Sequence, residues 1–138
     1  MRVVLDTNVF ISGIHWTGAS GKIINAWIDD RFELISSEEI LQELAKTLLN
    51  FKRPLSQEDI LHWISLIAAK AIIVIPTIDF NAVKADPDDN KFVNVAVEGN
   101  ADYIVSQDRD LLDIKEFQSI NIVHPEDFLK ILSYGEFT

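Results

Sequence analysis

The sequence of 138 residues contains no cysteine, few glycines and prolines, and few basic side chains. The lack of cysteine excludes disulfide frameworks and thiolate metal sites. Lys and Arg number 12 against 22 Asp and Glu, which gives a formal net charge of −10. This balance argues against nucleic-acid binding through a broad basic face. A nuclease is still compatible with it, because a metal ion supplies positive charge locally and acidic residues would be its ligands.

Long apolar runs are also lacking. The longest nearly apolar run, 64–75, contains Ser65 and Lys70 and is too short to span a bilayer. The N-terminus opens directly into Arg2-Val3-Val4-Leu5, too short for a signal peptide. We therefore expect a cytoplasmic protein without membrane contact. The length and the hydrophobic content of 48% fit one globular unit, and we predict a single domain over residues 1–138.

Short apolar runs alternate with helical patterns along the chain. The runs predict strands at 3–5, 32–35, 71–75, 103–105 and 120–123, and the periodicity predicts helices at 20–30, 37–49, 56–69, 86–99 and 126–132. Strands that alternate with helices indicate a mostly parallel sheet covered on both faces. The fold class expected is therefore α/β.

Six aspartates lie in the stretch 86–110, at both ends of a predicted helix and the strand after it. Asp89 precedes Phe92, Val93 and Ala96 by three, four and seven residues, so its carboxylate shares the apolar face and should point toward the sheet. Asp86 is predicted mainly as the helix cap, with Pro87 at the favoured first position. Asp88 is predicted as a first-turn acid stabilised by the helix dipole.

Two further carboxylates follow predicted strands. Asp6 ends the first strand, and Asp108 lies just past the strand 103–105. If these strands are neighbours, both carboxylates project into one crevice at the carboxyl ends of the strands. The helix from Ser37 brings a fourth candidate, and helical periodicity does not separate Glu38 from Glu43.

Clustered carboxylates need a compensating charge. Two charges ~5 Å apart at an effective dielectric of ~20 repel by roughly 3 kcal/mol, and several such pairs approach the whole stability of a domain, ~5–15 kcal/mol. The cluster must therefore bind a proton or a metal. Oxygen ligands without convergent His or Cys favour Mg²⁺ or Mn²⁺. Each acid alone has an ordinary explanation, as a helix cap, a loop acid or a solvated helix residue, so the hypothesis depends on their joint placement.

The motifs resemble those of the PIN-domain nucleases, and specifically of VapC-related toxins of toxin–antitoxin systems. The resemblance covers residues 2–130 and begins with VVLDTNVFIS, in which Asp6 matches the first metal-binding acid and Asn8 its supporting residue. The Glu-Leu pair of EEILQELAKTL selects Glu43. In DPDDNKFVNVAVEGNADYIVSQDRDLL, Asp89 and Asp108 match the third and fourth acids.

Some positions add to the family pattern or depart from it. The resemblance makes Asp110 an extra candidate ligand. Ser106 stands where the family commonly has Thr, which keeps the hydroxyl, and Gln107 stands where close relatives often have Gly. We further consider Lys46, Lys52 and Arg53 as phosphate contacts at the edge of the cleft, although they equally fit a solvated tip.

The resemblance implies a three-layer α/β/α sandwich with a mostly parallel sheet of about five strands. It implies an Mg²⁺- or Mn²⁺-dependent endoribonuclease acting on single-stranded RNA, with an antitoxin protein as partner and a homodimer as assembly. Two alternatives stand beside it: a non-catalytic PIN scaffold that binds RNA or protein, and an Mg²⁺-binding module like a phosphoacceptor receiver.

Overall fold

The fold is organised on a six-stranded sheet. The computed structural model describes residues 1–15, 17–52 and 55–135. The strand order is β3-β2-β1-β4-β6-β5, and all neighbours pair in parallel except β5 with β6. The strands are β1 (Arg2–Leu5), β2 (Glu33–Ser36), β3 (Ile72–Ile73), β4 (Tyr103–Val105), β5 (Glu116–Phe117) and β6 (Ile120–Val123).

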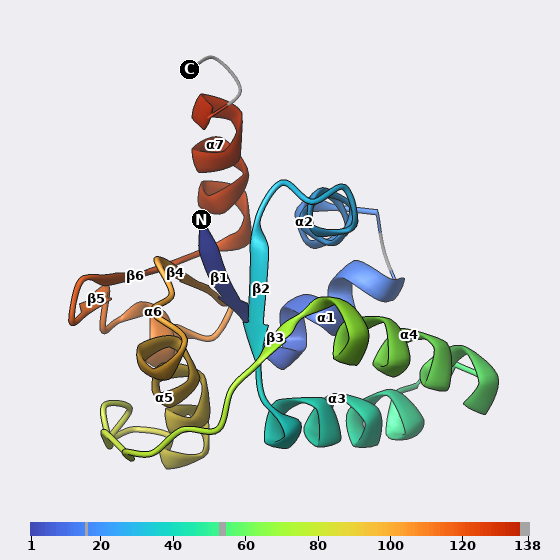
Figure 1. The fold of residues 1–138 in the computed structure, drawn as a ribbon, viewed down its shortest axis with the longest axis horizontal. Helices are drawn as coiled ribbons and strands as arrows, with labels where there is room; N and C mark the ends of the chain where they lie inside the picture. The colour runs from blue at the N-terminus through green and yellow to red at the C-terminus, as the bar shows by residue number, and fades with distance from the viewer. Residues whose placement is uncertain (16, 53–54, 136–138) are drawn as a thin grey trace.

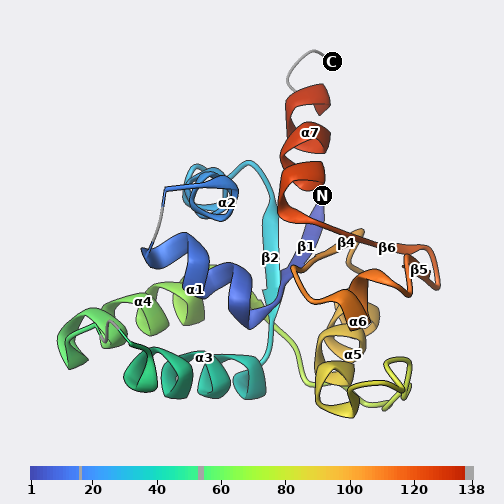
Figure 2. The same cartoon turned by 180° about the vertical axis from the view of Figure 1, so that it is seen from behind.

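Helices cover both faces of this sheet. They are α1 (Thr7–His15), α2 (Ala19–Ile28), α3 (Glu38–Asn50), α4 (Gln57–Lys70), α5 (Asn90–Glu98), α6 (Arg109–Leu112) and α7 (Pro125–Gly135), with a 3₁₀ helix, η1 (Pro87–Asp89), before α5. Figures 1 and 2 show α1 to α4 on one side of β1 and β2 and α5 on the other. The arrangement is the predicted α/β/α sandwich.

The two cores follow from the alternation of side chains along β1. Val3 and Leu5 point into the core formed with α1, α2, α4 and α7, whereas Val4 points into the core formed with α5. All three are at most 1% exposed. Because successive residues of a strand face opposite sides of the sheet, a continuous apolar run is what a strand covered on both faces requires.

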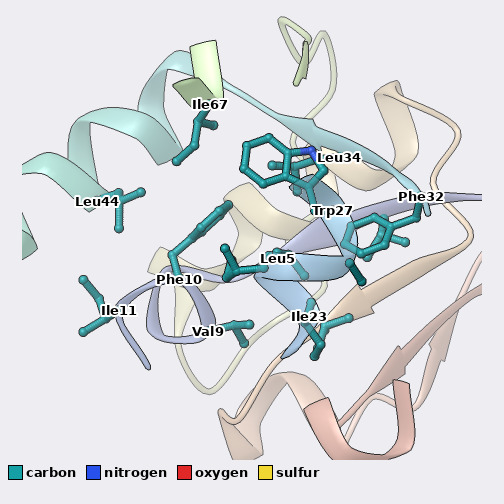
Figure 3. Close-up of a cluster of buried hydrophobic side chains, with 14 of the residues drawn as sticks. Leu5, Val9, Phe10, Ile11, Ile23, Trp27, Phe32, Leu34, Leu44 and Ile67 are labelled. Carbon is teal, nitrogen blue, oxygen red and sulfur yellow. The ribbon is translucent and has the colours of Figure 1, made fainter. Parts of the chain in front are cut away.

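The larger core is dense with aromatic and branched side chains. Figure 3 shows Trp27 of α2 and Phe10 of α1 packed with Leu5, Ile23 and Leu34 beneath the sheet. Trp27 and Phe10 are each 1% exposed. Burial of each such side chain stabilises the fold by roughly 1.5–3 kcal/mol relative to exposure. This packing fixes α1, whose first turn follows Asp6.

All five predicted strands are present, and the structure adds a sixth. The extra strand, β5, has two residues and pairs antiparallel with β6 at the sheet edge, too short to give a periodic signal. The strand predicted over 71–75 shortens to Ile72–Ile73, because it is an edge strand whose chain then leaves the sheet. Among the described residues, no helix has the length and apolar character needed to cross a membrane.

Gly13 permits the close approach of α1 and α2. A Cβ at this position would lie 2.8 Å from the backbone carbonyl oxygen of Ser20 and would also collide with Ile24. We expect Gly13→Ala to lower the free energy of unfolding by about 1–3 kcal/mol, because the backbone contact cannot relax by a rotamer change. Urea denaturation checks this, with Gly18→Ala as the control, since a Cβ at Gly18 meets nothing within 4 Å. Equal stability of the two variants would contradict the packing argument.

Candidate metal centre

The two strands that carry Asp6 and Asp108 are neighbours. β1 pairs in parallel with β4, with Leu5 opposite Val105, and the N–H of Asp6 donates to the carbonyl oxygen of Val105 at 3.1 Å. The carboxyl ends of both strands therefore lie at one edge of the sheet. This is the condition under which the sequence predicted that Asp6 and Asp108 share a crevice.

Asp6 is a buried carboxylate with several hydrogen-bond donors. It is 3% exposed, and its Oδ1 accepts from the N–H of Val9 at 3.1 Å. The backbone N–H of Asn8 is a further donor. Burial raises the pKa of Asp6 above its usual value, although the hydrogen bonds from Ser106, Val9 and Asn8 act in the opposite direction. The residue is therefore costly to keep ionised without a neighbouring cation.

Ser106 joins Asp6 to Asp108. Its hydroxyl donates to Oδ2 of Asp6 and accepts from the backbone N–H of Asp108 at 2.9 Å. The side chain is fully buried, and its hydroxyl is used both as donor and as acceptor. Asn8, predicted as the supporting residue of Asp6, is exposed and contacts Asp6 through its backbone N–H.

Three carboxylates converge beside this pair. Asp86, Asp89 and Asp108 each offer an oxygen, and these oxygens lie within 4.8 Å of one another. Oδ2 of Asp89 is buried and has no hydrogen-bond partner. A buried carboxylate oxygen without a hydrogen-bond partner is unfavourable unless a proton or a cation is there.

Protonation of the cluster follows from the same crowding. Burial, a hydrogen bond with Asp108 and the charges of Asp108, Asp86 and Asp6 raise the pKa of Asp89 to about 8. The hydrogen bond from Asp89 holds the pKa of Asp108 below its usual value. Of these two carboxyls, Asp89 is therefore the one that holds a proton more readily when no metal is bound.

The donor set fits a hard divalent cation. All the groups that converge are carboxylates, and one of them, Asp89, has a buried oxygen without a hydrogen-bond partner. Mg²⁺ and Mn²⁺ take such ligands, and a divalent charge would replace the proton of Asp89. Asp86, Asp89 and Asp108 would hold the ion, with Asp6 beside them through the Ser106 link.

The candidate acid of α3, Glu43, forms an ion pair with a lysine. Oε2 of Glu43, on α3, forms an ion pair with Nζ of Lys91, on α5. Lys91 also donates to Oδ2 of Asp88 at 3.1 Å and to the backbone carbonyl of Asp88 at 3.0 Å. Among the residues that the structure describes, Glu43 is therefore not one of the three converging acids.

Comparison with known proteins identifies the family. The profile of the PIN domain family matches residues 2–110. The chain belongs to the PIN domain family. It is also 33% identical over 142 residues to the uncharacterized protein MJ1680 of Methanocaldococcus jannaschii, a match that covers 94% of this chain and 90% of the relative.

Solved structures share the fold of this PIN domain. PAE2754 from Pyrobaculum aerophilum superposes with a TM-score of 0.63 at 14% identity, over 97% of this chain and 90% of its own. VapBC2 from Rickettsia felis, in a structure bound to a DNA fragment from their promoter, superposes with a TM-score of 0.62 at 14% identity. The match covers 90% of this chain and 98% of the other. VapBC-1 from nontypeable Haemophilus influenzae superposes with a TM-score of 0.59 at 19% identity, over 91% of this chain and 99% of its own.

Sequence reasoning missed two participants in this PIN domain. Asp86 is a cap, as predicted, since its Oδ1 accepts from the N–H of Asp88 at 3.3 Å, but its carboxylate also faces Asp89 and Asp108. Lys91 was missed because a lysine inside a helix is usually solvated. Its spacing of three residues from Asp88 is the signal that pairs them.

The remaining candidates lie around the cluster. Asp110 gives its backbone N–H to Oδ1 of Asp108 at 3.0 Å, and its own carboxylate is outside the three-acid group of the described residues. Lys46 and Lys52 are exposed. Arg53 lies outside the described residues.

Gln107, which precedes Asp108 in the chain, lines a cavity. The cavity has a volume of about 240 Å³ and is lined by Ser12, Gly18, Ala19, Ser20, Gln107, His124, Pro125 and Glu126. Nε2 of Gln107 donates to Oγ of Ser20 at 3.5 Å, so the amide is turned toward α2.

The raised pKa of Asp89 gives a dependence of stability on pH. Because the folded-state pKa, about 8, lies above the ordinary value of 3.8, the folded protein binds a proton more tightly than the unfolded chain between those values. The lowered pKa of Asp108 affects the stability only at pH values below about the ordinary value of 3.8. We expect the metal-free melting temperature to fall as the pH rises from 5 to 8, and Asp89→Asn to flatten this slope.

Melting curves in EDTA at several pH values provide the measurement. Asp127→Asn, an exposed position on α7, is the matched control and should keep the wild-type slope, since both variants retain the same histidines. An unchanged slope in Asp89→Asn would contradict the assignment of the proton.

Proposed function

We propose that this PIN domain is a metal-dependent endoribonuclease that hydrolyses phosphodiester bonds of single-stranded RNA. The observation that carries the proposal is the convergence of Asp86, Asp89 and Asp108, with an unpartnered buried oxygen, beside the buried Asp6. A PIN domain with an intact acidic cluster is the arrangement that this chemistry needs. The intact cluster also disfavours a non-catalytic scaffold.

The cofactor proposed is Mg²⁺ or Mn²⁺. When bound, such an ion supplies positive charge to the phosphodiester and lowers the pKa of a coordinated water, so no separate general base is needed. The acids of the cluster would bind and orient it. Ser106 keeps Asp6 and Asp108 at a fixed spacing, since its hydroxyl contacts both.

The site residues proposed are Asp6, Glu43, Asp89 and Asp108. Asp86 joins them on the geometry of the cluster, and Asp110 is an additional ligand proposed from the resemblance. Asn8 and Ser106 support Asp6. The phosphate contacts proposed are Lys46, Lys52 and Arg53. They would attract RNA phosphates, which the net charge of −10 otherwise repels.

An antitoxin protein is proposed as partner. The support is the likeness of the fold to VapBC2 and VapBC-1 and to FitAB bound to an IR36 DNA fragment, which matches with a TM-score of 0.59 at 13% identity. We propose that the chain is the toxin of such a pair and forms a homodimer in the cytoplasm.

The strand order disfavours the receiver alternative. In receiver domains the order is 2-1-3-4-5, so the first strand pairs with the second and third. Here β1 pairs with β2 and β4, and β3 lies at the edge beyond β2. The strand beside β1 that leads to Asp108 is thus β4, whereas in a receiver the strand in that place is the third.

Substitution of Asp6 tests the nuclease directly. We expect Asp6→Asn to abolish cleavage of single-stranded RNA in Mn²⁺, a loss of at least about a hundredfold by analogy with the removal of charged catalytic groups. In EDTA the same variant should melt higher than wild type, because a buried charge is removed. Gel-based cleavage of labelled RNA and melting curves provide the measurements.

The control for Asp6→Asn is Asp127→Asn, which removes an exposed carboxylate of α7 and should cleave like wild type. Full cleavage by Asp6→Asn would refute the proposed site. A lower melting temperature of Asp6→Asn in EDTA would count against crowding of charge at Asp6.

Ser106 provides a second test through the bridge that it forms. We expect Ser106→Ala to weaken Mn²⁺ binding and slow cleavage by about 10–100-fold, the usual effect of losing a group that orients a metal ligand. Ser106→Thr keeps the hydroxyl and should retain more of both, despite the tight fit of a fully buried position. Isothermal titration with Mn²⁺ measures this, and equal binding by the Ala variant and wild type would contradict a positioning role.

A further inference from the structure

The cavity lined by Gln107 is not used by the proposed metal chemistry. We call it the Gln107 pocket. Its polar side chains are Ser12, Ser20, Gln107, His124 and Glu126, and its volume is about 240 Å³. Pockets for drug-sized ligands run to roughly 300–1,000 Å³. The Gln107 pocket therefore has room for one planar ring system and not for a longer piece of a ligand.

The Gln107 pocket lies at the carboxyl edge of the sheet. Gln107 follows β4 and His124 follows β6, and these two strands pair in parallel. Gln107 also directly precedes Asp108, so their Cα atoms are about 3.8 Å apart. The helix of Ser12, α1, begins directly after Asp6, and Figure 1 shows α7 beginning where β6 ends, beside α2. The pocket thus shares the sheet edge at which the acids lie.

Two kinds of hydrogen-bond donor line the pocket. Ser20 is 4% exposed, and its Oγ accepts from Nε2 of Gln107 at 3.5 Å, so its hydroxyl hydrogen can donate to a further group. Nδ1 of His124 accepts from the backbone N–H of Glu126 at 3.3 Å. A neutral imidazole that accepts at Nδ1 carries its hydrogen on Nε2. Hydroxyl and ring N–H donors are therefore both present.

The acceptors of the pocket include a charged one. Glu126 is exposed on the first turn of α7, and an ionised carboxylate can only accept hydrogen bonds. Gln107 donates through its nitrogen and still has its amide oxygen as an acceptor. A carboxylate in the wall repels a phosphate group, because both are negative. The wall instead suits a neutral group with N–H donors.

Guanine is the RNA base that best matches this wall. Its Watson–Crick edge has the N1–H and the N2 amino group as adjacent donors, and one carboxylate with two oxygens can accept from both. Uracil has no amino group. Single-stranded RNA exposes these base edges to a protein. Contacts to bases are also what a chain with a net charge of −10 needs, since it repels the phosphates.

We propose that the Gln107 pocket binds a guanine base of the RNA strand, close to the scissile bond, with Glu126 as the acceptor for its N–H donors. Ser20 and His124 donate to the acceptors of the base, and Gln107 closes the pocket on the side of Asp108. The inference rests on the proposed function in that single-stranded RNA is the substrate, and it adds a base preference to that function.

Binding of single nucleotides to the full chain in EDTA tests the pocket without a metal ion. The probes are the 5′-monophosphates of guanosine, inosine and uridine, and inosine differs from guanosine only in lacking the N2 amino group. We expect the wild-type chain to bind the guanosine nucleotide about tenfold more tightly than the other two, the usual effect of a hydrogen bond to a charged acceptor. Chemical-shift titration by NMR measures these affinities.

Two adjacent acids on α7 give a matched pair of variants. Glu126→Gln removes the carboxylate of the pocket, whereas Asp127→Asn removes an exposed carboxylate outside its lining. We expect Glu126→Gln to reduce the preference for guanosine over inosine nucleotide to within about twofold, and Asp127→Asn to keep it. Both side chains are exposed, so melting curves should show both variants folded like wild type.

The cleavage pattern in Mn²⁺ gives a second readout. Wild type should cut an RNA of mixed sequence preferentially near guanine, and Glu126→Gln should cut with a weaker base preference. Equal binding of the three nucleotides by wild type, or an unchanged preference in Glu126→Gln, would overturn the inference and leave the proposed nuclease standing. A chain that cleaves no RNA would overturn the nuclease, whereas a preference for the guanosine nucleotide in EDTA would still support the base pocket.

Discussion

The parallel pairing of β1 with β4 is the constraint on which the rest of the structure depends. Backbone hydrogen bonds between these strands bring residues 6 and 108 to one edge of the sheet, although about a hundred positions separate them in the chain. The cores on both faces then hold this pairing, since Leu5 and Val105 belong to one core and Val4 and Ile104 to the other. An acidic site can be stable here only because apolar burial on two sides offsets the repulsion that the acids create.

The electrostatics of the edge is arranged in two zones. In one zone, three aspartates converge, burial and neighbouring charge raise the pKa of Asp89 to about 8, and Oδ2 of Asp89 has no hydrogen-bond partner. In the other, Glu43 and Asp88 share the ammonium of Lys91. The second zone thus sets one ammonium against two carboxylates, whereas the first is a group of carboxylates alone.

Much of the fold could be predicted from the sequence, because its signals are local. The apolar runs located five strands, Ser37 and Ser56 cap α3 and α4 as their positions indicate, and the helical spacing of Asp89 identified it as facing inward. The two-residue β5 gave no periodic signal. Which acids share one ion depends on side-chain directions across three elements, which spacing within one element cannot supply. The pair of Glu43 with Lys91 was missed for the same reason.

The bridge made by Ser106 has a consequence for the order in which the chain becomes complete. Asp6 is synthesised before its hydroxyl donor Ser106 and before Asp108, which follow 100 and 102 positions later. Until β4 has left the ribosome, Asp86 and Asp89 are present, but Asp6 has neither the hydroxyl of Ser106 nor the neighbouring carboxylate of Asp108. A nascent chain therefore cannot complete this site before β4 is made, and a truncated product that ends before β4 lacks Ser106 and Asp108.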